Sequence, residues 1–136
     1  MSVFTSHELA YLSSQRLARI ATASGSGVPD VSAVTFGLDG DDVLTGGYDI
    51  TKTVRYGNLL ANPRAVIVID DLASTNPWTP RGVKVRGNAT IEEGSGGLRI
   101  RIVATTIWSW GINPEPGGHF RGIERRTVGS DSSTSQ

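Results

Sequence analysis

The residues best suited to chemistry in this 136-residue chain lie close together, between positions 45 and 58. Gly46 and Gly47 carry no side chains that would cover their backbone amides, and the cations Lys52 and Arg55 follow shortly after. Exposed amides, the donors at the start of a helix and nearby cations together favour an anion such as a phosphate. The segment therefore predicts a phosphate site. The alternative interpretation is a basic helix face that is only exposed to water.

Other catalytic groups are absent or badly spaced. The chain has no cysteine, and its two histidines, His7 and His119, are far apart in the sequence, so we predict no metal site and no Ser–His pair. Asp70 and Asp71 are adjacent, and adjacent residues of a strand point to opposite faces, which disfavours a glycosidase-type carboxylate pair. Any chemistry would then be carried by a bound cofactor.

Composition limits the partners and the number of domains. Thirteen cations balance thirteen anions, which argues against a nucleic-acid-binding protein. No run approaches the roughly 18 apolar residues of a membrane span, and the first residues lack a leader pattern, so we expect a cytoplasmic protein that does not bind membranes. We predict one domain over 1–128 and a disordered tail of small polar residues over 129–136.

We expect strands, more than helices, to hold the predicted phosphate-binding segment in place. Its seventeen glycines and many short β-branched runs favour an all-β fold. The first three strands would form an antiparallel meander, and the fourth, RAVIVID, would be buried on both faces because its apolar run is continuous. Strands at this spacing close most easily into a small barrel. The apolar patterns predict six strands, at 16–24, 31–38, 43–48, 64–70, 83–93 and 98–110.

Two short helices are also expected. Thr5 and Glu8 have the spacing of a capping box, so a helix begins the domain. A second helix, inserted among the strands, is expected over 51–61 and would stop at Asn62-Pro63. The residues that recur at helical spacing in it are Val54, Asn58 and Ala61.

Two further features could contact a ligand. The segments VSAVTF and LTGGY, expected side by side, offer small side chains on which a planar ring could lie, with Val34 and Thr35 near its edge. Ordinary strand packing is the alternative. Trp78 lies in a proline-rich loop, and Trp108 and Trp110 lie near the end of the last expected strand. These tryptophans either cover a ligand, enter a partner subunit or fill the ends of the barrel.

Taken together, these segments resemble the split β-barrels of the pyridoxamine-phosphate-oxidase-like family. The order of the motifs carries the resemblance over roughly residues 8 to 112: LARIATASGSGVPDVSAVTF, then VLTGGYDITKTVRYGNLLANPRAVIVIDD, then RGVKVRGNATI. The blocks DDLASTNPWTPRGVKVRGNA and RIRIVATTIWSWGI are similar to the branch of this family that uses the deazaflavin coenzyme F420.

The resemblance implies a six-stranded antiparallel split β-barrel of the FMN-binding type, assembled as a homodimer with two cofactor sites at the subunit interface. It also implies a set of cofactor-binding residues. These are Ser32, Ala33, Val34 and Thr35 along the ring; Thr45, Gly46, Gly47 and Tyr48 along the ribityl chain; Thr51, Lys52, Arg55 and Asn58 at the phosphate; and Trp78 and Arg81 from the partner subunit.

The sequence departs from the family pattern at several positions. The family's usual phosphate-binding lysine falls at Arg55, and Gly57 takes a position that is often basic. Ala104 and Thr106 stand where relatives often have proline and arginine. Because arginine and lysine are not interchangeable at a phosphate, these departures bear on cofactor affinity and not on the fold.

The function that the resemblance implies is an F420-dependent oxidoreductase, which transfers hydride between the deazaflavin and a small unsaturated organic substrate, with the reductase direction preferred. Tyr48 is a candidate proton donor, and solvent is the alternative. Two other functions stay open: an FMN-binding oxidase or reductase of the same superfamily, and a non-catalytic protein that binds a flavin or deazaflavin.

Overall fold

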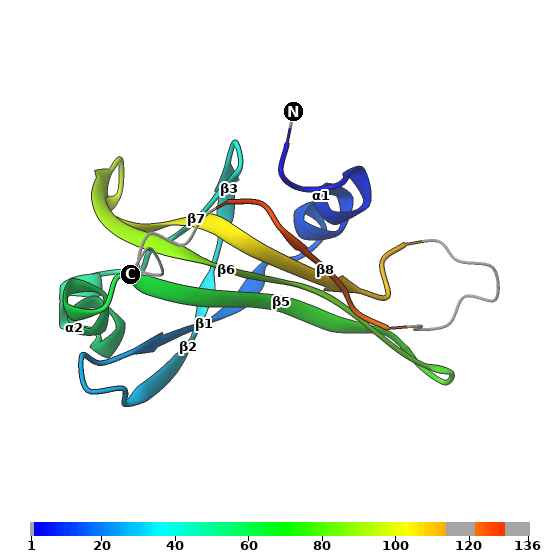
Figure 1. The fold of residues 1–136 in the computed structure, drawn as a ribbon, viewed down its shortest axis with the longest axis horizontal. Helices are drawn as coiled ribbons and strands as arrows, with labels where there is room; N and C mark the ends of the chain where they lie inside the picture. Colours follow the sequence, from blue (N-terminus) through cyan, green and yellow to red (C-terminus); the bar gives the residue numbers. More distant parts are fainter. Residues whose placement is uncertain (1, 114–121, 130–136) are drawn as a thin grey trace.

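The computed structural model describes residues 2–113 and 122–129 (Figure 1). Within them, eight antiparallel strands form one sheet, accompanied by the helices α1 (Ser6–Ser13) and α2 (Val54–Ala61) and the 3-10 helix η1 (Ile50–Lys52). No helix in these ranges is long and apolar enough to cross a membrane. The strands are β1 (Leu17–Ala23), β2 (Pro29–Thr35), β3 (Gly37–Asp39), β4 (Asp42–Thr45), β5 (Arg64–Thr75), β6 (Trp78–Gly94), β7 (Gly97–Trp110) and β8 (Glu124–Thr127).

The sheet returns on itself to make a barrel. Its strand order is β2-β1-β5-β6-β7-β4-β3, so β2 and β3 are the two ends of the path, with β8 added beside β7. The chain joins these two ends through the single residue Phe36. Thr45 of β4 also donates from its Oγ1 to the carbonyl oxygen of Thr35 at 2.6 Å, which links β4 to the end of β2. The predicted fold class, an all-β split barrel with short helices, is confirmed.

Two of the eight strands were not predicted. The run expected as one strand over 31–38 divides at Phe36 into β2, which pairs with β1, and β3, which pairs with β4. The division lets one run of residues contribute to both ends of the sheet. β8 has the sequence ERRT, which has no apolar alternation, and it pairs with β7. The count of six strands is therefore too low. Most of the expected tail, 130–136, and His119 lie outside the described residues.

Only one face of β5 is buried. Ala65, Ile67 and Ile69 point into the barrel and are at most 2% exposed, whereas Val66 and Val68 lie half-buried on the outer face. The expectation of burial on both faces is wrong for the single chain, because no other layer of the described residues covers the outside of this sheet.

Helix α1 begins at the predicted capping box. The Thr5 Oγ1 accepts from the Glu8 amide at 3.1 Å, and the Glu8 Oε1 accepts from the Thr5 amide at 2.9 Å. Glu8 is only 1% exposed and forms an ion pair with Arg126 of β8. Burial acts to raise the pKa of Glu8, but the hydrogen bonds from Arg126 and Thr5 hold that pKa below its ordinary value. This pair ties α1 to the last described strand.

Helix α2 buries a face that is partly polar. Its buried residues are Arg55, Asn58 and Leu59, whereas Val54 is 62% exposed. Asn58 donates from its Nδ2 to the Oγ1 of Thr22 at 3.0 Å, inside the barrel. Of the predicted helical row only Asn58 is buried, and the exposed side of the helix includes the apolar residues Val54 and Leu60. The helix places Arg55 beside the end of β4.

Candidate functional site

Part of the predicted anion segment is brought together in the structure. β4 ends at Thr45, and Gly46 and Gly47 follow it directly. Arg55 of α2 donates from its Nη2 to the carbonyl oxygen of Gly46 at 3.3 Å. A Cβ added at Gly47 would lie 3.0 Å from this same Nη2, which is closer than ordinary packing allows. The absence of a side chain at Gly47 therefore lets the guanidinium group lie this close without a shift.

The guanidinium group of Arg55 is buried without a balancing carboxylate in the described part of the chain. The residue is 9% exposed, and its Nε is the one buried side-chain polar atom of the described residues that has no hydrogen-bond partner. Leaving a buried donor unpaired costs about 1–3 kcal/mol, and more for a charged group. A buried cation with unused donors fits an incoming anion.

Two hollows adjoin Gly46. One measures about 270 Å³ and the other about 220 Å³, and both are lined by Gly46 and Arg99. Because they share these residues, we treat them as one feature and name it the Gly46 groove. The larger hollow is also lined by Gly47, Gly94, Ser95, Gly96, Gly97 and Leu98, and the smaller one by Thr35, Phe36, Gly37, Leu44 and Thr45.

Arg99 lines the groove but was not predicted as a site residue. The alternation of apolar and charged residues in its strand indicates only that its side chain faces solvent. Its side chain packs along Gly94 and forms an ion pair with Glu92 at 2.7 Å. Arg101 also binds Glu92, and the hydrogen bonds from Arg101 and then Arg99 lower the pKa of Glu92 to about 2. The charge of Arg99 is thus balanced, whereas Arg55, which lies against Gly46 and Gly47 behind the groove and lines neither hollow, has no carboxylate partner among the described residues.

The other residues predicted at the phosphate lie elsewhere. Thr51 and Lys52 are exposed on η1, and the carboxylate of Asp49 caps this helix by accepting from the Thr51 amide at 3.1 Å and from its Oγ1 at 2.6 Å. Thr53 caps α2, its Oγ1 accepting from the Tyr56 amide at 3.3 Å. The helix-start amides expected to bind an anion are therefore partly occupied by side chains of the chain itself.

The residues predicted along the ring alternate between the two faces of β2. Val34 is 6% exposed and points inward with the half-buried Ser32, whereas Ala33 and Thr35 are exposed on the outer face. Of these four, Thr35 alone lines the Gly46 groove. Tyr48, predicted along the ribityl chain, is fully exposed.

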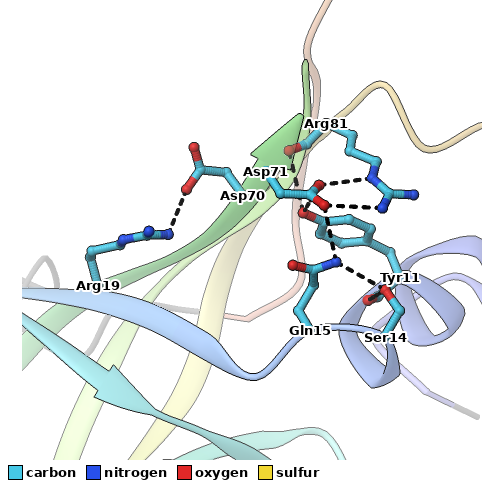
Figure 2. A network of polar contacts seen from close by, with 7 residues as sticks. All are labelled: Tyr11, Ser14, Gln15, Arg19, Asp70, Asp71 and Arg81. Atoms are coloured by element: carbon cyan, nitrogen blue, oxygen red, sulfur yellow. Dashed lines mark hydrogen bonds and ion pairs between the residues drawn. The ribbon is translucent and has the colours of Figure 1, made fainter. Parts of the chain in front are cut away.

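Trp78 and Arg81 lie on the β5–β6 hairpin, at the opposite end of β5 from α2 (Figure 1). Trp78 is 68% exposed. Arg81 donates from its Nε and Nη2 to the two oxygens of Asp71 at 2.8 and 3.0 Å, and its guanidinium lies 5.1 Å from the centre of the Tyr11 ring (Figure 2). The single chain does not bring these two residues to the Gly46 groove, so they could meet it only in another subunit.

Comparison with known proteins agrees with this architecture. A family model described as pyridoxamine 5'-phosphate oxidase matches residues 4–104. A 5a,11a-dehydrotetracycline/5a,11a-dehydrooxytetracycline reductase from Streptomyces rimosus is 30% identical over 132 residues, an alignment that covers 88% of this chain and 93% of that protein.

Solved structures share the fold at lower identity. A heme binding protein from Mycobacterium smegmatis superimposes with a TM-score of 0.67 at 21% identity, covering 91% of this chain and 58% of that one. A FAD-binding protein from Mesorhizobium loti gives a TM-score of 0.61 at 16% identity, covering 78% of this chain and 93% of that one. At these identities the likeness establishes the barrel and not the group it binds.

Proposed function

The chain belongs to the pyridoxamine 5'-phosphate oxidase family, and from that premise we propose that it is an F420-dependent oxidoreductase that works mainly as a reductase. The family match over residues 4–104 and the 30% identity to a reductase support an oxidoreductase. The deazaflavin, when bound, would supply the hydride chemistry for a small unsaturated organic substrate. The observation that carries the proposal is the buried, uncompensated Arg55 beside the Gly46 groove.

Arg55 suits the phosphate of such a cofactor. Its planar guanidinium offers several donors in a fixed geometry, and among the described residues it makes one hydrogen bond, to Gly46 at 3.3 Å. Burial reduces screening by water, so an ion pair formed there is stronger than one at the surface. The replacement of the family's usual lysine by arginine keeps the charge and adds donors.

Other residues of the groove would orient the cofactor and not react with it. The hydroxyl of Thr45 is committed to the carbonyl oxygen of Thr35, so it fixes the groove wall. Gly46 and Gly47 line the groove without side chains, so a ligand there would meet their backbone directly. Tyr48 is so exposed that its hydroxyl has no advantage over water as a proton donor, and we propose that solvent supplies the proton.

We also propose that the protein works as a homodimer with the cofactor sites between subunits. The outer face of β2, β1 and β5 carries apolar residues in register, with Val31 paired to Ala21 and Ala21 to Val66. Val31 is 66% exposed, and exposed apolar surface often marks an interface. Trp78 of the partner subunit would then be available to cover the Gly46 groove.

FMN is the second candidate cofactor, and one observation favours it. Because Glu92 balances Arg99, Arg55 is the one uncompensated cation that the described residues place beside the groove, which matches the single phosphate of FMN. The longer anionic tail of the deazaflavin would have to reach the exposed Lys52. Titrating the protein with each cofactor separates the two assignments, and binding of either without turnover would indicate a non-catalytic carrier.

A further inference from the structure

A separate hollow lies at the junction of α1 and β1. It measures about 300 Å³, a volume at the lower end of the roughly 300–1,000 Å³ found for small-molecule sites. We name it the Leu17 hollow. It is lined by Ser14, Gln15, Arg16, Leu17, Arg19 and Asp70.

One lining residue of the Leu17 hollow is the strand partner of a lining residue of the Gly46 groove. Leu17 is paired with Thr35 in the ladder between β1 and β2, so their side chains are neighbours on one face of the sheet. Both residues are exposed there, and Thr35 also lines the Gly46 groove. A ring held along Thr35 would therefore have the Leu17 hollow beside it.

The polar walls of the Leu17 hollow are held in place by contacts within the chain (Figure 2). Asp70 accepts from the Nη1 of Arg19 at 2.9 Å. Gln15 donates from its Nε2 to Asp71 at 3.3 Å, and Asp71 is itself fixed by Arg81. These contacts order the walls before any ligand arrives, which lowers the entropy cost of binding.

Arg16 supplies the net charge of the hollow. Arg19 is balanced by Asp70, whereas no carboxylate of the described residues pairs with the exposed Arg16. Leu17, 55% exposed, provides the apolar part of the surface. An apolar surface beside one uncompensated guanidinium group fits an organic anion that carries a hydrophobic ring.

We propose that the Leu17 hollow binds the substrate, and that this substrate is a hydrophobic ring compound bearing one acidic oxygen group. Arg16 holds the acidic group and Leu17 contacts the ring, next to the position of Thr35. The role as a substrate site rests on the proposed function, whereas binding of such an anion does not depend on it.

Two fluorescent probes that share a ring system test this proposal: anthracenecarboxylate, which is charged, and anthracenemethanol, which is not. Fluorescence anisotropy of each probe with the full chain at neutral pH should show about tenfold tighter binding of the carboxylate, the size expected for one charge-assisted hydrogen bond. Arg16→Gln should remove this preference. Arg125→Gln, which removes the same charge from an exposed position on β8, should keep it. Equal binding of both probes by the unmodified chain, or equal effects of the two variants, would overturn the proposal.

Two more measurements separate this inference from the proposed function. Leu17→Ser should weaken both probes alike, with an unchanged circular dichroism spectrum as the check on folding. Titration of Arg16→Gln with F420 and FMN should show unchanged cofactor affinity. If the unmodified chain binds neither cofactor but keeps the Arg16-dependent preference for the carboxylate probe, the anion site is supported and the proposed function is wrong. If it binds a cofactor but shows no such preference, the proposal for the Leu17 hollow is wrong and the proposed function is unaffected.

Discussion

The guanidinium group of Arg55 lies directly against Gly47, so closely that a Cβ at residue 47 would be 3.0 Å from its Nη2. One residue is a buried cation, and the other is a glycine at which a Cβ would require the guanidinium group to shift by a few tenths of an ångström. The proposed cofactor site depends on this relationship, which places an uncompensated charge at the edge of the Gly46 groove.

Gly47→Ala should displace Arg55 and weaken cofactor binding by about tenfold, the order of one charge-assisted hydrogen bond. Gly57→Ala is the matched control, because a Cβ there meets nothing within 4 Å and Gly57 lies in α2. The control should bind cofactor normally and unfold at a free energy about 0.5–1 kcal/mol higher, since alanine is the better helix former. Equal cofactor affinity in both variants would mean that the position of Arg55 does not matter.

Glu8→Gln should lower the free energy of unfolding by about 2 kcal/mol, because it leaves Arg126 without its buried ionic partner. Urea unfolding of the two proteins measures the difference. Glu93→Gln, an exposed change on β6, should have little effect. If Glu8→Gln were equally neutral, the ion pair between α1 and β8 would not contribute to stability.

Acid should weaken the contribution of Asp71 to the stability of the fold. The hydrogen bonds from Arg81 are the largest cause that lowers the pKa of Asp71 in the folded chain. A lowered folded-state pKa gives stability that is present above the unfolded value of about 3.9 and is lost as the pH falls through the folded value. Asp71→Asn should therefore be less stable than the unmodified chain at pH values above that range. The difference should shrink below about pH 4; a constant difference over the whole range would contradict this origin.

Tyr48→Phe should leave the rate of substrate reduction unchanged, because the Tyr48 hydroxyl is fully exposed and water can replace it. Steady-state kinetics with a substrate identified for the unmodified protein provides the test. A large fall in kcat with an unchanged KM would instead assign the proton transfer to Tyr48.

The sequence predicts the barrel and the start of α1 well, because both depend on local patterns. The alternation of Val83 and Val85 marks a half-buried strand, and the spacing of Thr5 and Glu8 marks a capping box; both appear in the structure. The division at Phe36 and strand β8 were missed, because the first needs the closure of the sheet and the second has no apolar pattern.

The site is harder to read from sequence, because its geometry depends on residues far apart in the chain. Arg55 could be named as a phosphate-binding residue from its motif, but its burial against Gly47 could not be foreseen. Arg99 enters the groove through the β6–β7 turn, and Leu17 meets Thr35 only through strand register. Neither of these spatial relationships can be inferred from the pattern of residue types alone.

The most direct test of the account is a fluorescence titration of the purified protein with F420 and with FMN, each repeated on Arg55→Ala. We expect tighter binding of F420 than of FMN, and a loss of about tenfold or more in Arg55→Ala, because the buried guanidinium would no longer meet the phosphate. Circular dichroism of Arg55→Ala should confirm that the barrel is intact. Tighter binding of FMN would contradict the choice of cofactor, and unchanged affinity in a folded Arg55→Ala would contradict the phosphate site itself.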